Sequence, residues 1–484
     1  MQSQSMNKSR HSALAVLIII YFFWGFVAAS NDILTSHFKD IFHLKQYRAQ
    51  LVEFAFYIAY FSGSLIYFAF TMLKGDILNR FGYKKGLIAG LLISATGALC
   101  FIPAANLNSY PLLLISLFIV GLGFTLQQIV ANPYVIALGD PSTGSHRLNL
   151  TGGGNSFGTT IGPVLLSFAL YGSIKSSVAV QSSVDSIKVP AIILCCMLLL
   201  SVAVLSFSKL PSVTREEHTE KNLGALRYPQ LVLGMIAIFF YVGVEVTIGS
   251  NLNVLLKLKE IKDIPGSQIS TFVSLYWGGL MIGRWRGAIS VFNLTPLKRK
   301  VLMIVVPLAG FAVICCVNLI RGSDITDYIF YLPFLALAII AFFLGQEKPA
   351  KTLLLFSSIA ICLILMGLIS MGDLALFSFV SAGLFCSVMW PCIFTLATTG
   401  LGKYTNQGSS LLIMMILGGA VIPLIQGRLV DGVPLFGLYI FPKLGAHYSY
   451  IVPVFCFGYL AFYGWRVKHI FRKQGLTADA IISE

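Results

Sequence analysis

The sequence predicts an all-α integral membrane protein with about fourteen transmembrane helices. Three observations carry this prediction: the composition, the recurrence of apolar segments and an internal repeat. The chain has 484 residues, of which 57% are hydrophobic and only 11% are charged. A soluble protein carries about 25% charged residues. Apolar runs of about 20 residues, the length that crosses a bilayer as a helix, recur along most of the chain.

A polar segment at 208–228 divides the apolar segments into two groups. Its sequence, SKLPSVTREEHTEKNLGALRY, is charged and contains proline, which is typical of a linker between domains. We therefore expect an N-terminal six-helix bundle at 1–207, a cytoplasmic linker, a C-terminal bundle at 229–466 and a cytoplasmic tail at 467–484. The transmembrane segments are expected near 13–38, 49–73, 86–104, 110–138, 154–172, 190–207, 229–250, 266–288, 301–320, 327–345, 352–371, 374–398, 408–427 and 447–466.

The basic residues indicate how the chain is oriented. The formal net charge is +15, and most of the 34 Lys and Arg residues lie in segments that face the cytoplasm if both termini do. Cytoplasmic loops carry such an excess, so we expect a protein of the cell inner membrane with both termini cytoplasmic and no nucleic-acid partner. The nine cysteines all lie in apolar segments, which predicts neither a disulfide framework nor a metal site. We also expect a monomer and no cofactor.

Two stretches of the sequence echo each other and predict an internal repeat. In VANPYVIALGDPSTGSHRLNLTGGGNSFGTTIGP and VMWPCIFTLATTGLGKYTNQGSSLLIMMILGGAVIP, Pro133 pairs with Pro391 and Pro163 with Pro423. A second echo, FSGSL and YWGGL, has a shorter spacing, and the difference leaves room for two helices. We therefore expect a helical hairpin inserted within 301–371. Repeated halves joined by a linker are typical of alternating-access carriers, whose substrate site lies between the halves near mid-membrane.

A loop motif narrows the fold further. The stretch GDILNRFGYKKG resembles the loop between helices 2 and 3 of the major facilitator superfamily, which runs Gly-x-x-x-Asp-Arg-x-Gly-Arg-Lys. Asn79 stands where that motif has Asp, which weakens the case for a charged conformational latch there. The positions that fit the conformational motif are Gly75, Arg80, Gly82, Lys84 and Lys85. The resemblance implies two six-helix bundles of the major facilitator type, with the inserted hairpin in the second half as a departure from the twelve-helix plan.

Five blocks in order carry a closer resemblance. They are NDIL, ANPYVIALG, RLNLTGGGNSFG, YVGVEVTIGSNL and GLGKYTNQGSSLLIMMILGGAVIP. Together they are similar to the fucose/proton symporter family of sugar permeases, and most of all to its glucose/galactose-type branch. The resemblance covers most of residues 13–466 and implies that a sugar and protons move inward together.

The resemblance also implies roles for single residues. In the fucose branch one carboxylate of helix 1 and one of helix 4 line the cavity; Asp32 stands at the first position and Gln128 at the second. Asn155 matches a sugar-binding Asn of helix 5, whereas Gly152 stands where the fucose branch has Gln. Glu245 replaces an amide of the seventh helix. These departures argue against fucose itself as the substrate.

Three acidic residues lie within apolar segments: Asp32, Glu53 and Glu245. A carboxyl group in the membrane is costly and marks a functional site; when neutral it donates to a sugar hydroxyl, and when ionised it needs water or a partner. We expect Asp32 and Glu245 to couple protons to transport. A structural hydrogen bond is the alternative for Asp32, and a solvated helix end is the expectation for Glu53.

Amide and aromatic side chains within the spans are candidate sugar ligands, because sugars need neutral donors, acceptors and ring faces. Gln128 and Asn132 are four residues apart and share a helix face. Asn132 precedes Pro133, and the alternative role for it is to satisfy backbone groups freed by the proline kink. Trp277 and Trp390 offer stacking surfaces, with helix packing as the alternative. The candidate substrate-binding residues are Asn31, Gln128, Asn132, Asn155, Trp277 and Trp390.

The leading hypothesis is therefore a secondary active transporter that imports a neutral, glucose/galactose-like hexose with protons by alternating access. Its partners would be the sugar, the proton and the lipid bilayer. A carrier or exporter of another small solute and a polytopic membrane enzyme remain alternatives; an enzyme would place clustered His, Asp or Cys at a membrane face. Arg284 and Arg286 close a span at its cytoplasmic end, where we expect headgroup anchoring or pairing between the halves.

Overall fold

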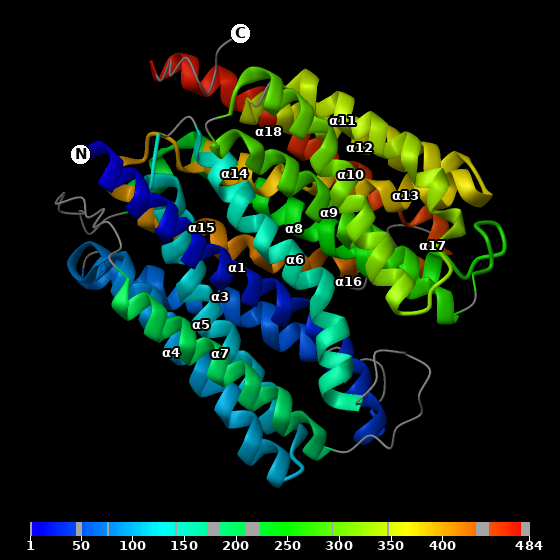
Figure 1. Ribbon diagram of the computed structural model, residues 1–484, viewed down its shortest axis with the longest axis horizontal. Coiled ribbons are helices and arrows are strands. Elements are labelled where there is room, and N and C mark those ends of the chain that lie inside the picture. Colours follow the sequence, from blue (N-terminus) through cyan, green and yellow to red (C-terminus); the bar gives the residue numbers. More distant parts are fainter. Residues whose placement is uncertain are drawn as a thin grey trace. The chain divides into compact units, whose positions relative to one another are not determined.

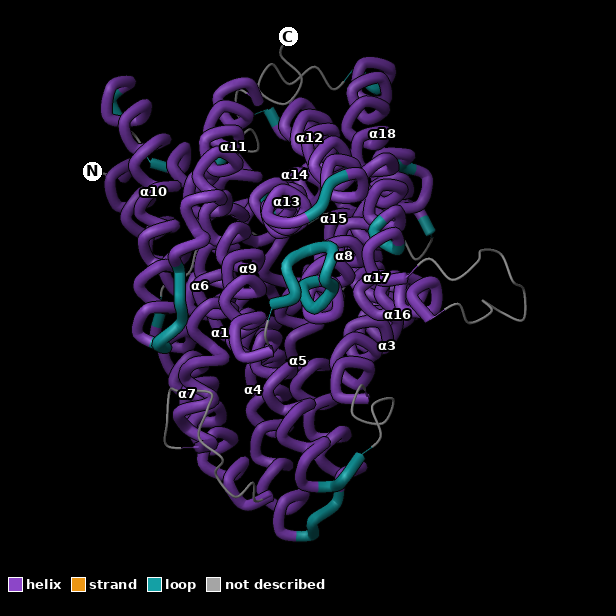
Figure 2. Tube along the Cα trace, turned by 90° about the vertical axis from the view of Figure 1, so that its right-hand side faces the viewer, coloured by secondary structure: helices purple, strands orange, loops and turns teal. Residues whose placement is uncertain are grey.

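The computed structural model describes most of the chain, and the parts it describes are helical (Figures 1 and 2). Within these parts, eleven helices are long and apolar enough to cross a membrane. The prediction of an all-helical membrane protein is confirmed, while the number of membrane crossings and the inserted hairpin stay predictions. The described residues are 2–44, 51–74, 77–140, 143–171, 184–208, 223–264, 266–292, 294–345, 348–431 and 445–475.

A helix lies over every expected span. The longer ones are α1 (Gln2–Ile41), α3 (Leu51–Lys74), α4 (Ile77–Asn106), α5 (Tyr110–Ala137), α6 (Gly144–Tyr171), α7 (Lys188–Phe207), α8 (Pro229–Leu255), α9 (Gly266–Ala288), α10 (Pro296–Ile320), α11 (Leu332–Gly345), α12 (Pro349–Ile369), α13 (Gly372–Cys386), α14 (Met389–Thr398), α15 (Thr405–Met414), α16 (Gly418–Asp431) and α18 (Ile451–Lys473). Short helices are α17 (Gly445–Tyr448) and the 3₁₀ turns η2 (Val184–Ile187), η3 (Gly224–Arg227), η4 (Ile289–Val291), η5 (Thr326–Tyr331), η6 (Gly402–Tyr404) and η7 (Met415–Leu417).

The chain divides into two compact units. Unit 1 consists of Met1–Tyr228 and Thr398–Met415, and unit 2 consists of Pro229–Ala397 and Ile416–Glu484. The segment that contains α15 therefore belongs to unit 1, where α15 packs against α3 and α5. Most of the expected linker, at 209–222, lies outside the described residues.

The same helix pairings occur in both units. In unit 1, α1 packs on α6, α3 on α5, and α4 on both α5 and α7. In unit 2, α8 packs on α16, α9 on α13, and α12 on both α13 and α18. The helices that follow α9 in the chain, α10 and α11, have no counterpart in this scheme. In its helix contacts, α12 of unit 2 therefore corresponds to α4 of unit 1.

One close contact repeats in detail. Gly158 of α6 lies so near the Phe22 carbonyl of α1 that a Cβ atom would overlap its oxygen, and Gly418 of α16 lies in the same way on the Phe239 carbonyl of α8. Glycine permits such backbone approach between membrane helices. Gly158 and Gly418 have the same sequence spacing as Pro163 and Pro423, so the contact supports the repeat predicted from the prolines.

Two expected spans are each one candidate membrane helix in the structure, but their α-helical hydrogen bonding is interrupted. The span expected at 374–398 consists of α13 and α14, which are separated by a turn at Ser387 and Val388. The span expected at 408–427 consists of α15, η7 and α16. Ser387 keeps helical dihedral angles, with φ −51° and ψ −42°, so the helical hydrogen bonding is interrupted there while the backbone stays helical. The interruption at Ser387 is fully buried, and a candidate functional site lies beside it.

Candidate functional site

Glu245 lies in the middle of α8, and its carboxylate forms the centre of a polar cluster in unit 2. Its Oε1 accepts hydrogen bonds from the Tyr241 hydroxyl, at 3.0 Å, and from the Arg284 guanidinium of α9, at 3.2 Å. The side chains of Glu245 and Arg284 are only 14% and 10% exposed. A charge this far from water needs a partner of opposite sign, and the two side chains provide it for each other.

A proline explains why Arg284 lies where it does. Pro391 has no N–H, so the carbonyl four residues earlier, that of Ser387, lacks its helical donor. Arg284 Nε donates to this carbonyl at 3.2 Å. The guanidinium thus joins α8, α9 and the turn between α13 and α14. Headgroup anchoring, one of the two expectations for Arg284, does not describe this buried position; pairing between the halves stays a prediction.

The two candidate tryptophans lie around the same cluster. The Trp390 ring lies 6.2 Å from the Tyr241 ring, measured between centroids. Trp277 packs edge-on against Tyr276 at 5.3 Å, and the Tyr276 hydroxyl donates to the Glu245 carbonyl at 2.7 Å. Both tryptophans are partly exposed, so each retains ring surface beside a site that already holds a charge pair.

A second cluster lies in unit 1, between α1 and α5. The Tyr21 hydroxyl donates to Asn132 Oδ1 at 2.5 Å, and Trp24 Nε1 donates to Gln127 Oε1 at 3.0 Å. Gln127 also donates to the Ser94 hydroxyl at 3.1 Å and is fully buried. Through these hydrogen bonds, the Gln127 side chain links α5 to α1 and α4.

The candidate amides of this cluster have different neighbours. Gln128 is partly exposed and donates to the Tyr60 hydroxyl at 2.9 Å. Asn132 is fully buried and donates to the Gln128 carbonyl at 2.9 Å, which is not the carbonyl that Pro133 frees. Asn155 of α6 is partly exposed and donates to the Tyr21 carbonyl at 3.2 Å.

Pro133 of unit 1 frees a carbonyl as Pro391 does in unit 2. The carbonyl four residues before Pro133 is that of Ile129, and the Ser409 hydroxyl of α15 donates to it at 3.0 Å. The two prolines paired by the sequence repeat therefore have the same local consequence. In unit 1 a neutral hydroxyl satisfies the carbonyl, whereas in unit 2 a charged guanidinium does so.

Several predicted residues are only partly covered by the structure. Asn31 and Asp32 lie within α1, but their side chains are outside the described residues, and so is the Arg80 side chain; Gly75 is outside altogether. Glu53 lies in the first turn of α3 and is half-buried.

The described part of the loop motif has a structural role in unit 1. Gly82 has φ 79° and kinks α4, a conformation that suits a residue without Cβ. Lys84 Nζ donates to the Ser206 and Ser208 carbonyls, both at 2.9 Å, at the C-terminal end of α7. A cation there complements the helix dipole. Lys85 is exposed.

In the described ranges, no three His, Cys, Asp or Glu side chains are grouped so that they could hold a metal ion. What the two clusters offer is hydrogen bonding from amides and hydroxyls, aromatic surface and one buried charge pair. Polar groups of this kind beside interrupted helices are the features of a membrane transporter. This is the class of protein that the fold and the two clusters define.

The chain belongs to the Major Facilitator Superfamily, whose sequence model matches residues 12–350. The resemblance inferred from the motifs is confirmed. The chain is 33% identical over 463 residues to a glucose/galactose transporter of Brucella abortus (strain 9-941), with 95% of both chains covered. It is 27% identical to the L-fucose-proton symporter of Escherichia coli (strain K12), with 86% of each chain covered. Its relatives are transporters, which confirms the expectation of a transporter rather than an enzyme.

The fold is also that of a known transporter structure. The crystal structure of the Major Facilitator Superfamily transporter FucP in the outward conformation superposes with a TM-score of 0.70. The match covers 95% of this chain and 99% of FucP, at 24% sequence identity. The chain is accordingly a multi-pass membrane protein of this fold.

Sequence reasoning missed the most buried parts of the site. Arg284 was expected at a membrane face, and Tyr241, Tyr21 and Tyr60 were not singled out. One signal could have found Arg284: Pro391 predicts an unsatisfied carbonyl, and a membrane helix nearby must supply a donor.

Proposed function

We propose that this protein imports a neutral monosaccharide of the glucose/galactose type together with protons, by alternating access. The observation that carries the proposal is the 33% identity to a glucose/galactose transporter across 95% of both chains. The named L-fucose-proton symporter supports proton coupling as the energy source. Membership of the Major Facilitator Superfamily and the repeated helix pairings support the alternating-access mechanism.

Proton coupling is assigned to Asp32 and Glu245. A symporter must bind its proton and its sugar with a favourable coupling free energy, so that each raises the affinity for the other. Glu245 supports this role because it shares its carboxylate with Tyr241 and Arg284, and any change in its charge alters both partners. Asp32 is assigned from the motif NDIL and its place in helix 1.

The charge balance of the polar cluster in unit 2 favours a neutral substrate. The Glu245 and Arg284 charges balance each other, so a substrate beside them meets hydrogen-bonding groups and ring faces without a net charge. We assign substrate contact to Asn31, Gln128, Asn132, Asn155, Trp277 and Trp390. Among them the partly exposed Gln128, Asn155, Trp277 and Trp390 retain surface for a ligand.

We infer that α10 and α11 are the inserted hairpin. The argument is the packing of α12, which contacts α13 and α18 as α4 contacts α5 and α7. With α12 as the third helix of the second repeat, the pair before it is the addition. A pair of helices leaves later helices in the same orientation across the membrane, which supports both termini on one side. We place them in the cytoplasm, in an inner-membrane monomer.

Transport by purified protein in proteoliposomes tests the proposal. Uptake of a labelled hexose panel is measured with and without an inward proton gradient. We expect glucose or galactose to accumulate above equilibrium only with the gradient, and Asp32→Asn to lose this accumulation while sugar exchange remains measurable. Gradient-independent uptake of every hexose, or outward movement of another solute class, would overturn the proposal. Normal accumulation by Asp32→Asn would remove Asp32 from the coupling mechanism.

A further inference from the structure

The hairpin α10–α11 contacts α9 along nearly its whole length. Near the start of α9, the Tyr328 hydroxyl of η5 donates to the Thr271 carbonyl at 2.7 Å. One turn on, Asn318 of α10 donates to the Ser274 hydroxyl at 3.0 Å. The α9 positions that face the hairpin are Thr271, Ser274, Gly278 against Ile314, Ile282 against Gly310, and Arg286, whose guanidinium lies 4.4 Å from the centre of the Phe342 ring of α11.

These positions form one stripe, because residues three or four apart share a helix face. The remaining faces of α9 meet the functional cluster. Gly283 packs against Ser387 at the α13 end, Gly279 lies close to both Leu384 of α13 and Tyr331 of the hairpin, and Arg284 reaches Glu245 of α8. The hairpin therefore contacts α9 mainly along this stripe, whereas Gly283 and Arg284 meet the cluster from another face of the helix.

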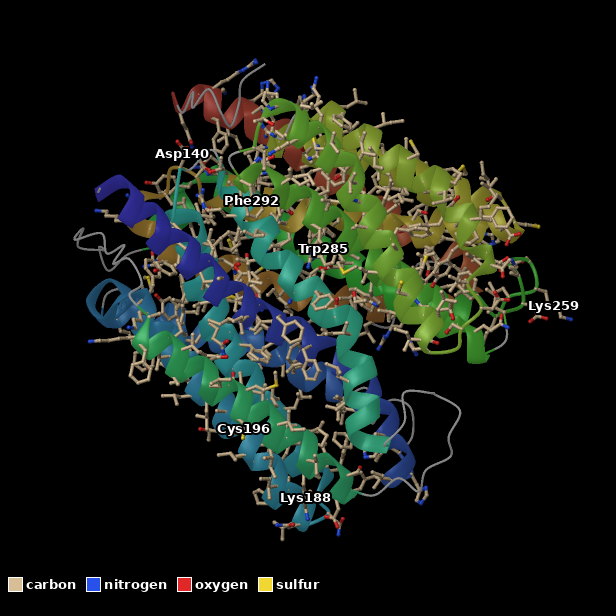
Figure 3. The ribbon with its side chains drawn as sticks, viewed as in Figure 1. Asp140, Lys188, Cys196, Lys259, Trp285 and Phe292 are labelled. Carbon is tan, nitrogen blue, oxygen red and sulfur yellow. The ribbon has the colours of Figure 1, made fainter. Side chains whose placement is uncertain are left out.

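Ion pairs hold the loop that precedes the N-terminal end of α9. Lys262, in the loop before α9, donates to Asp327 at 2.7 Å and to Asp373 at 2.6 Å. Asp327 belongs to η5 of the hairpin and Asp373 to the first turn of α13. Figure 3 places Lys259 of this loop and Phe292, beyond the other end of α9, at opposite ends of the helix. The contacts between the hairpin and α9 thus extend from Lys262, in the loop before the helix, to Arg286 in its last turn.

We propose that the hairpin is a fixed brace that keeps α9 in register, so that Arg284 stays against Glu245 and the Ser387 carbonyl. Asn318 and Tyr328 are then positioning residues: they act on Arg284 through α9 and touch no substrate. The brace itself rests on the contacts above, and only its effect on transport rests on the proposed function.

A brace is needed because a shift of α9 along its axis would break the interactions of Arg284. A shift of α9 by one turn is about 5.4 Å, which would separate the guanidinium from both partners. The glycines of α9 allow close packing but add little side-chain contact of their own. The two hydrogen bonds and the stacked Arg286 fix the register because their partners lie on separate turns.

Maleimide labelling of Cys386 tests the brace without any substrate. Cys386 is fully buried at the end of α13, next to the carbonyl that Arg284 holds. In a background that retains only this cysteine, we expect Asn318→Leu with Tyr328→Phe to raise the labelling rate about tenfold. The matched control retains only Cys456, equally buried in α18, and its rate should change less than twofold. An unchanged Cys386 rate, or equal acceleration at both cysteines, overturns the brace.

Two further measurements keep the result decisive. If the double variant is not recovered, Tyr328→Phe alone removes a single hydroxyl and should still raise the Cys386 rate at least twofold; no change overturns the proposal. In proteoliposomes, the double variant should lose most gradient-driven accumulation while exchange persists, and normal accumulation would contradict a positioning role. Failure of the unaltered protein to move any hexose would reject the proposed function, and the labelling result would still decide the brace.

Discussion

Replacing Glu245 with Gln removes one negative charge from unit 2 and keeps the size and one acceptor oxygen of the side chain. The Tyr241 hydroxyl, 3.0 Å from Glu245 Oε1, can still donate to the amide oxygen. Arg284 keeps its bond to the Ser387 carbonyl but loses its counter-charge. The substitution therefore isolates the ion pair from the rest of the cluster.

The expected loss of stability is about 3 kcal/mol. Removing one partner of a buried ion pair costs about 3–5 kcal/mol, because the other charge stays buried without compensation. The lower end applies here, since the two side chains retain 10% and 14% exposure and Arg284 keeps a carbonyl partner. A loss of this size is about a hundredfold in the unfolding equilibrium. Glu245→Gln combined with Arg284→Met removes both charges and should recover all but about 1 kcal/mol.

Chemical denaturation of the purified protein in lipid nanodiscs measures these differences. Tyr241→Phe is the matched control: it deletes one hydrogen bond of the carboxylate, leaves both charges and should cost about 1 kcal/mol. The reasoning is refuted if Glu245→Gln is as stable as the parent protein, or if the double variant is no more stable than Glu245→Gln. Either result would mean that the pair is solvated enough for each charge to stand alone.

Three further predictions concern packing and charge. Gly418→Ala places a methyl group on the Phe239 carbonyl and should lower stability by about 2 kcal/mol, seen as a lower denaturation midpoint; an unchanged midpoint would refute the close approach. Lys84→Met removes two bonds to the last carbonyls of α7 and should cost about 1 kcal/mol, which equal stability of the variant would contradict. Burial lowers the pKa of Lys262, but its bonds to two aspartates raise it more, so the net pKa lies above 10.5. The stabilisation from Lys262 is then present below the unfolded pKa and lost as pH rises through the raised folded pKa. Lys262→Met should therefore cost about 1 kcal/mol at pH 7 and less at a pH above the folded pKa. A cost that grows with pH would disprove the pairing.

The sequence predicts helix positions well because apolar length is a strong signal in membranes. A helix lies over each expected span, and the proline pairs predicted the repeat that the helix pairings display. The interruption of helical hydrogen bonding at Ser387 was not predicted, for a physical reason. The stretch around Ser387, FCSVMW, is apolar and has neither Gly nor Pro at the turn itself, so its pattern is typical of an unbroken helix.

The sequence predicted which residue types form the candidate site, but it did not predict which side chains contact one another there. Glu245, Trp277 and Trp390 were identified as polar or aromatic residues within spans, and the structure brings them around one cluster. Arg284 was missed because charge near the end of an apolar segment is ordinarily an interface signal. Only three-dimensional packing reveals that α9 carries this residue to a buried carbonyl.

The repeated prolines explain why the two units carry different chemistry at equivalent places. Each proline leaves one carbonyl without its helical donor; Ser409 satisfies the carbonyl before Pro133, and Arg284 satisfies the one before Pro391. A hydroxyl brings no charge, so unit 1 needs no further residue. A guanidinium brings a full positive charge into a buried position, and Glu245 balances it. If transport places a proton on Glu245, the charge of Arg284 is no longer balanced, and a neutral sugar cannot replace the carboxylate. Protonation of Glu245 would then cost about as much as the Glu245→Gln substitution, because Arg284 keeps its bond to the Ser387 carbonyl but loses its counter-charge. A brace that holds Arg284 against Glu245 therefore favours release of that proton.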